Sequence, residues 1–148
     1  MAPFNQSAQA ALTAAIAEAR GMKHNYIGQE HLLLALAADE TNTATQLFAS
    51  VGANGERVQS AVRHVIGKGT ASGDHERPYT PRTVQALALA EQEAARFDED
   101  EVDTAHLVLG MLSEGHGIGA GILTSLGFTL ESGRETVLGL ISGEDADA

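Results

Sequence analysis

Apolar and small residues recur every three to four positions along most of the chain, the spacing that places them on one face of an α-helix. The clearest stretch is 5–20, in which this face consists of Ala8, Ala11, Leu12, Ala15, Ile16 and Ala19. Further helices are predicted from near Gly28 to about Ala38, over 43–50, and after the N-cap Asn54. The apolar face of the helix after Asn54 is expected to contain Val58, Ala61, Val62, Val65 and Ile66. The pattern predicts an all-α fold.

The same order of residues returns 75 positions later, without a gap between the pairs Pro3/Pro78 and Ile66/Ile141. Thr80-Pro81 opens the second copy, as an N-cap followed by proline at the first helical position. A tandem duplication of a four-helix repeat, forming one pseudo-symmetric eight-helix domain over 1–148, is the simplest account. The expected parts are repeat one at 4–67, a linker at 68–78, repeat two at 79–142 and an acidic, disordered tail at 143–148.

Charge and composition narrow the classes of partner. The formal net charge is −11, which argues against binding to nucleic acid or to an anionic membrane surface. No apolar run has membrane-spanning length, and the first residues show no secretion signal. The absence of cysteine excludes disulfides and thiolate chemistry. We expect a cytoplasmic protein.

The stretch Gly28-Gln29-Glu30 begins the second predicted helix with a glycine N-cap and a first-turn carboxylate. Exposed N–H groups and the helix dipole favour an anion there, while Glu30 offers a carboxylate to a cation. A solvated carboxylate at a helix start also needs no function, so the residues alone leave both interpretations open. The second copy has Asp103, Thr104 and Ala105 at these positions.

His31 and His106 occupy equivalent positions in the two copies. Each is either a ligand-binding or catalytic residue or a partly buried histidine that hydrogen-bonds between helices, and we favour the structural role. The other histidines lack metal-binding spacing, so no metal and no cofactor are predicted. No nucleophile–base arrangement and no phosphate-binding loop is found, which predicts a protein that is not an enzyme.

The segment His24-Asn25-Tyr26-Ile27-Gly28-Gln29-Glu30-His31-Leu32-Leu33-Leu34-Ala35-Leu36, its echo, and Tyr79-Thr80-Pro81-Arg82 resemble the Clp N-terminal repeat domain. That domain stands at the front of ClpC- and ClpA-type AAA+ unfoldases. The resemblance implies recognition of substrates or adaptor proteins. It also implies a phosphoarginine site at Gly28, Gln29 and Glu30, with Glu30 binding the guanidinium. In the second copy Ala105 has replaced that glutamate, so a degenerate second site is expected.

Two functions follow from the resemblance. The first is a non-enzymatic module that binds a Clp ATPase, its adaptors or its substrates and modulates Clp-dependent protein degradation. The alternative is a decoy that sequesters cyclic-peptide antibiotics directed at the unfoldase, with Phe4 and Tyr79 as its peptide-binding surface. The chain carries no ATPase motif, so we expect a stand-alone member of the family.

Overall fold

The computed structural model describes residues 2–142, which fold into eight α-helices and no β-strand. The helices are α1 (Gln6–Gly21), α2 (Gln29–Ala38), α3 (Thr43–Ser50), α4 (Gly55–Val65), α5 (Pro81–Arg96), α6 (Thr104–Glu114), α7 (Ile118–Ser125) and α8 (Leu130–Ser142). The order and number of the helices repeat after α4, as expected for a duplicated four-helix unit. The predicted tail at 143–148 lies outside the described residues.

Polar side chains mark where several helices begin. Asn5, Asn42, Asn54 and Thr80 each accept a hydrogen bond from a backbone N–H in the first turn of the helix that follows. Such caps satisfy N–H groups that have no partner inside the helix. The predicted starts at Gly28, Asn54 and Thr80 are therefore confirmed.

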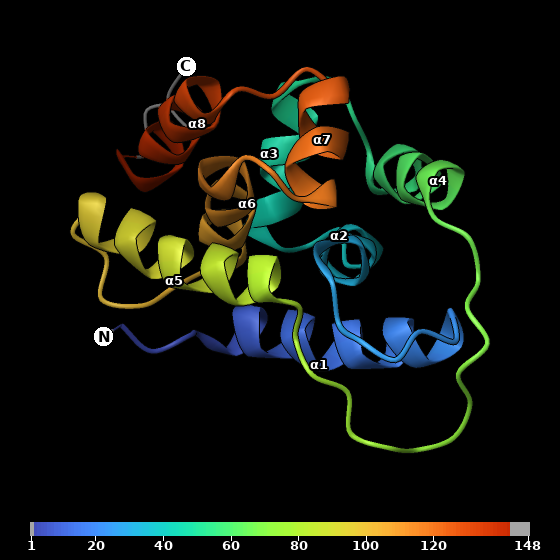
Figure 1. Ribbon diagram of the computed structural model, residues 1–148. Helices are drawn as coiled ribbons and strands as arrows, with labels where there is room; N and C mark the ends of the chain where they lie inside the picture. Colours follow the sequence, from blue (N-terminus) through green and yellow to red (C-terminus); the bar gives the residue numbers. More distant parts are fainter. Residues whose placement is uncertain (1, 143–148) are drawn as a thin grey trace.

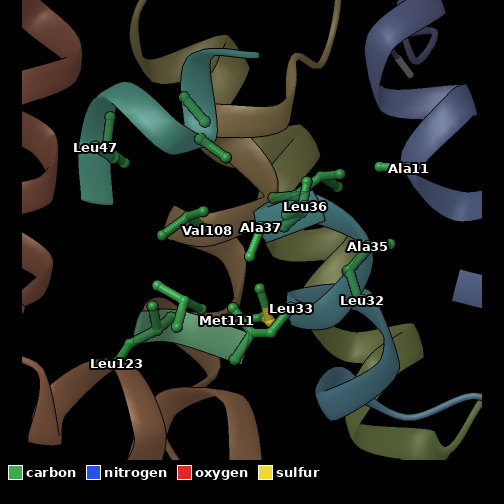
Figure 2. Packing of buried hydrophobic residues seen from close by; sticks show 14 of the residues in the cluster. Ala11, Leu32, Leu33, Ala35, Leu36, Ala37, Leu47, Val108, Met111 and Leu123 are labelled. Atoms are coloured by element: carbon green, nitrogen blue, oxygen red, sulfur yellow. The ribbon is translucent and has the colours of Figure 1, made fainter. Parts of the chain in front are cut away.

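The core is built around α2 and α6, which lie in the middle of the molecule (Figure 1). Leucines of α2 face Val108 and Met111 of α6, and Ala11 of α1 closes one side (Figure 2). Small residues let the helices approach closely. A Cβ built on Gly110 of α6 would lie 2.3 Å from the Ala86 carbonyl oxygen of α5. Close packing of the helices depends on small side chains at their contacts, and the low aromatic content of the chain is consistent with this.

The two repeats exchange their N-terminal arms. Phe4 forms a parallel bridge with Val102 of the second repeat, and Tyr79 forms the equivalent bridge with Ile27 of the first. Val102 N–H donates to the Pro3 carbonyl at 2.8 Å, and Ile27 N–H donates to the Pro78 carbonyl at 2.8 Å. This exchange places the start of α5 beside the start of α2, where the candidate site lies.

Two helical faces differ from the prediction. Ile16 of α1 is 39% exposed and Val65 of α4 is 59% exposed, although both follow the helical spacing of the buried residues. Ile16 lies at the edge of its apolar stripe, whereas Val65 is the last residue of α4. The spacing identified the helices correctly and overestimated the extent of their buried faces.

No helix within 2–142 is by itself both long and apolar enough to cross a membrane. One pair, α6 and α7, meets that test jointly by length and composition, with a bend of 100° between them.

Candidate functional site

A cavity of about 470 Å³, here called the first-repeat cavity, opens at the start of α2. Its walls come from the connector before α2, the first turn of α2, the start of α5 and the start of α7. The lining residues are Tyr26, Gln29, Glu30, Thr80, Pro81, Arg82, His116, Gly117 and Ile118. Both repeats therefore contribute to it.

Glu30 supplies the negative charge of this cavity. The residue is only 4% exposed, and within residues 2–142 no Lys, Arg or His nitrogen lies within 4 Å of its carboxylate. The Tyr26 hydroxyl donates to Glu30 Oε2 at 3.2 Å. Burial, the Glu30 charge and this hydrogen bond raise the pKa of Tyr26, so the phenol keeps its proton and remains a donor.

Gly28 makes room for that carboxylate. A Cβ built on Gly28 would lie 2.1 Å from Glu30 Oε1, so any other residue would displace it. Gly28 is also an N-cap with no side chain to occupy the helix start. The backbone N–H groups of Gln29 and Glu30 consequently have no acceptor among residues 2–142. Free N–H groups at a helix N-terminus attract anions.

The side chain of Gln29 is buried and fully occupied within the protein. Its Oε1 accepts from the Gly119 N–H of α7 at 3.0 Å. Its Nε2 donates to the Arg82 carbonyl of α5 and to Glu114 Oε1 of α6, both at 3.1 Å. Gln29 therefore offers its backbone N–H to the first-repeat cavity, while its amide connects α2 to three helices of the second repeat.

Arg82 brings a positive charge to the rim. Its side chain is 59% exposed, and Nη1 lies 3.1 Å from Glu114 Oε2. Burial acts to raise the pKa of Glu114, but hydrogen bonds from Gln29, Gly117 and Arg82 outweigh it and hold the pKa below its usual range. Glu114 is thus an anion that orients Arg82. Sequence reasoning did not assign a role to Arg82, because only the arm exchange brings α5 to the first repeat.

His31 has a structural role, as predicted, but it is fully buried and hydrogen-bonds to its own N-cap and to the connector before α2, not between helices. Its Nδ1 accepts from the Gly28 N–H at 2.9 Å, so the neutral ring carries its proton on Nε2, 2.7 Å from His24 Nδ1. His24 Nε2 in turn lies 2.9 Å from the Gly67 carbonyl oxygen. Burial lowers the pKa of His31 to about 4, with the neighbouring His24 acting in the same direction. This chain of contacts joins the N-cap of α2 to Gly67, at the end of the first repeat.

A second cavity, of about 430 Å³ and here called the second-repeat cavity, occupies the equivalent place at the start of α6. Its helix start is already capped. The Thr104 N–H donates to Asp103 Oδ1 at 2.7 Å, and the Ala105 N–H donates to the Thr43 hydroxyl at 3.1 Å. Thr43 takes the place that Ile118 has in the first-repeat cavity, a difference that sequence reasoning overlooked.

The equivalent of Gln29 is Thr104, whose hydroxyl accepts from the Ala44 N–H of α3 at 3.1 Å. Thr104 is fully buried, so its side chain also serves the fold. Ala105 puts a methyl group where the first repeat has the Glu30 carboxylate. The second-repeat cavity therefore lacks an equivalent of the Glu30 carboxylate, and the N–H groups of Thr104 and Ala105 already have acceptors.

His106 repeats the contact of His31 with its own N-cap. Its Nδ1 accepts from the Asp103 N–H at 2.9 Å, but its buried Nε2 has no hydrogen-bond partner within residues 2–142. The position of His24 is taken by Glu99, which forms no hydrogen bond or ion pair with His106 among residues 2–142. Burial lowers the pKa of His106, against the raising effect of Asp103, Glu99 and Glu93.

The two aromatic residues of the predicted peptide surface lie beside different connectors. Phe4 is half-buried next to Val102, and Tyr79 is half-buried next to Ile27. Both pack against the core with part of the ring in solvent. Tyr79 thus precedes the α5 start that borders the first-repeat cavity, whereas Phe4 precedes the corresponding start of α1.

Within residues 2–142, eight helices in two pseudo-symmetric repeats, with a cavity at the second helix of each, define a duplicated helical domain. The family of the Clp repeat N-terminal domain matches residues 3–95 and again residues 78–146. The chain belongs to this family.

Similar proteins include the negative regulator of genetic competence ClpC/MecB of Bacillus subtilis, 34% identical over 142 residues, and chloroplastic chaperone ClpC of Pisum sativum, 34% identical over 145 residues. These alignments cover 96% and 98% of the chain but only 17% and 16% of those relatives. A solved complex of the ClpV N-domain with a VipB peptide has the same fold, with a TM-score of 0.72 and 15% identity over 93% of this chain and 84% of that one.

Proposed function

We propose that the chain is a non-enzymatic protein-binding module that recognises substrates or adaptors of a Clp unfoldase and so modulates Clp-dependent protein degradation. The observation that carries this proposal is the pairing, in the first-repeat cavity, of two free N–H groups with an unpaired buried carboxylate. The solved complex of the related ClpV N-domain with a peptide supports polypeptide recognition by this fold.

The ligand group that matches the first-repeat cavity is phosphoarginine. Its phosphate would lie on the N–H groups of Gln29 and Glu30, and its guanidinium would lie on the Glu30 carboxylate. Arg82 stands at the rim as a further contact for the phosphate. In the second-repeat cavity Asp103 and Thr43 already occupy the corresponding N–H groups, so we expect one phosphoarginine per chain.

Calorimetry with phosphoarginine and with a peptide that carries it tests the assignment. One site per chain is expected, and Glu30→Gln should weaken binding about ten- to hundred-fold, because a charge-assisted hydrogen bond of about 1.5–3 kcal/mol is lost. Glu40→Gln, at an exposed position beyond the C-terminal end of α2, is the matched control. Two equivalent sites, or a site that survives Glu30→Gln, would contradict the proposal.

The role in degradation has its own test. Excess chain added to a reconstituted Clp protease should slow the breakdown of an arginine-phosphorylated substrate by competition, and Glu30→Gln should abolish the effect. The non-enzymatic assignment has a separate test, because ATP hydrolysis by the pure chain would contradict it.

A further inference from the structure

The second-repeat cavity has the opposite electrostatic character to the first. Its rim is formed by Asp98, Glu99, Asp100 and Glu101, and none of its lining residues is a lysine or arginine. Within residues 2–142 no carboxylate of this rim lies within 4 Å of a basic nitrogen. Unpaired carboxylates gathered around one cavity attract cations strongly.

The wall opposite the acidic rim is apolar. Val137, Leu140 and Ile141 of α8 line it, and Ile141 is 43% exposed. A lysine or arginine side chain has an aliphatic stem that packs on such a surface while its charged end reaches the carboxylates. The wall also leaves room for an apolar neighbour of the basic residue.

His106 independently adds an unsatisfied hydrogen-bond donor to this cavity. It lines the second-repeat cavity, is 4% exposed, and holds an Nε2 that has no partner within the described part of the chain. Because Nδ1 accepts from the Asp103 N–H, Nε2 of the neutral ring carries a proton and is a donor without an acceptor. In the first repeat His24 faces the corresponding nitrogen of His31.

We propose that the second-repeat cavity binds a basic polypeptide segment in which an arginine or lysine stands next to an apolar residue. The basic side chain lies among the rim carboxylates of Asp98, Glu99, Asp100 and Glu101. The apolar side chain lies on Ile141, and a backbone carbonyl of the segment accepts from His106. A free polyamine satisfies only the first of these contacts, because it has neither an apolar side chain nor a carbonyl. This site uses a different cavity from the one proposed for phosphoarginine.

An end-capped hexapeptide of alternating leucine and arginine is a suitable probe, titrated into the full chain while backbone amide and histidine ring ¹⁵N shifts are recorded. We expect shifts at Glu99, Ala105, Ile141 and the His106 ring. The same peptide with glutamate in place of arginine should not bind. Spermidine should bind at least about tenfold more weakly and leave the His106 ring unshifted.

Matched variants separate local recognition from net charge. Asp98→Asn combined with Glu101→Gln should weaken the leucine–arginine peptide about fivefold, since each exposed carboxylate contributes modestly. Asn is compatible with the left-handed backbone at Asp98, where φ is 56°. Glu40→Gln combined with Glu56→Gln removes the same charge elsewhere and should leave binding unchanged.

Glu30→Gln distinguishes this proposal from the phosphoarginine site, because it should remove phosphoarginine binding and leave the leucine–arginine peptide unaffected. The proposal fails if both double variants weaken the peptide equally, if spermidine binds as well as the peptide, or if the shifts are confined to the first-repeat cavity.

Discussion

At Gly28 the lack of a side chain determines where the neighbouring Glu30 carboxylate lies. The backbone there is extended, with φ −106° and ψ 176°, so an L-residue is compatible with the conformation. The constraint is spatial, because a Cβ would meet Glu30 Oε1. The end of a flexible side chain can move away, and the carboxylate would then leave its position beside the free N–H groups.

Gly28→Ala should therefore affect binding much more than stability. We expect phosphoarginine to bind about tenfold more weakly, while the free energy of unfolding changes by less than about 1 kcal/mol. Calorimetry and urea unfolding measure the two effects. Gly21→Ala, where a Cβ meets nothing within 4 Å, is the control and should change neither. A loss of several kcal/mol on Gly28→Ala would show that the glycine has another structural role.

The buried histidine of the first repeat predicts a pH dependence. The pKa of His31 falls from 6.5 in the unfolded chain to about 4 in the folded chain. As the pH is lowered, the unfolded state therefore takes up a proton at a higher pH than the folded state. The neutral His31 ring makes its full contribution to the free energy of unfolding above about pH 6.5. This contribution is lost as the pH falls toward 4, and the loss is about 3 kcal/mol at most. Urea unfolding at pH 7.5, 6 and 4.5 measures it.

His31→Asn keeps an acceptor for the Gly28 N–H and removes the titration, so the stability loss between pH 6.5 and 4 should shrink in this variant. His75→Asn, at an exposed position, should retain the full loss. Identical pH profiles for the wild-type chain and His31→Asn would show that His31 is not the group responsible.

At the scale of the helices, a side chain of each repeat accepts a hydrogen bond from the first turn of a helix in the other repeat. Gln29 of α2 accepts from the third helix of the second repeat, and Thr104 of α6 accepts from the third helix of the first. The pseudo-symmetric positions thus perform the same task with different side chains. Gln29 is longer and also reaches Glu114, which holds Arg82 at the first-repeat cavity. Changes at position 29 therefore act on packing and on the site together.

Gln29→Ala should destabilise the chain by about 2–3 kcal/mol, because the buried Gly119 N–H loses its acceptor and a cavity forms. Thermal or urea unfolding measures the loss. Gln92→Ala, on the exposed surface of α5, should have little effect. An unchanged stability for Gln29→Ala would mean that water replaces the amide at no cost.

At the scale of the whole molecule the two repeats share one core. Helices α1 and α3 of the first repeat contact α6, and α2 contacts α7. The inter-repeat linker adds further connections, since the Gly69 N–H donates to the Met22 carbonyl at 2.8 Å and the buried Arg77 Nε donates to the His24 carbonyl at 2.6 Å. Neither half buries its apolar residues alone.

Fragments 1–72 and 73–148 should accordingly be poorly folded when separate and recover helix when mixed. Short helices without tertiary partners are marginal in water, so each fragment should show less than about half of the native helical circular dichroism signal per residue. The mixture should approach the intact chain, whereas doubling the concentration of one fragment should not. A half with a dispersed NMR spectrum of its own would contradict the shared core.

The sequence by itself determined the helices, their caps and the duplication, because these depend on residues close in the chain. The N-cap Asn54, the Thr80-Pro81 start and the 75-residue shift are local or periodic signals, and the structure confirms them. It also located Gly28 and Glu30 together at one helix start. Their role in binding phosphoarginine remains a prediction, as do the peptide surface at Phe4 and Tyr79 and the cytoplasmic location.

Only the tertiary structure decided which groups at that helix start are free. The arm exchange brings Arg82 to the first-repeat cavity, and the packing of α7 on α2 and of α3 on α6 brings Ile118 to the first cavity and Thr43 to the second, all from more than 50 positions away. Thr43 caps the Ala105 N–H, whereas Ile118 has no hydroxyl and leaves the equivalent N–H of Glu30 open. The helical periodicity of the sequence does not predict such a contact, because the contact depends on how two helices of different repeats pack. The charge at a helix start is determined by residues close to it in the sequence. Whether a ligand can reach that helix start is determined by the helix of the other repeat that packs over it.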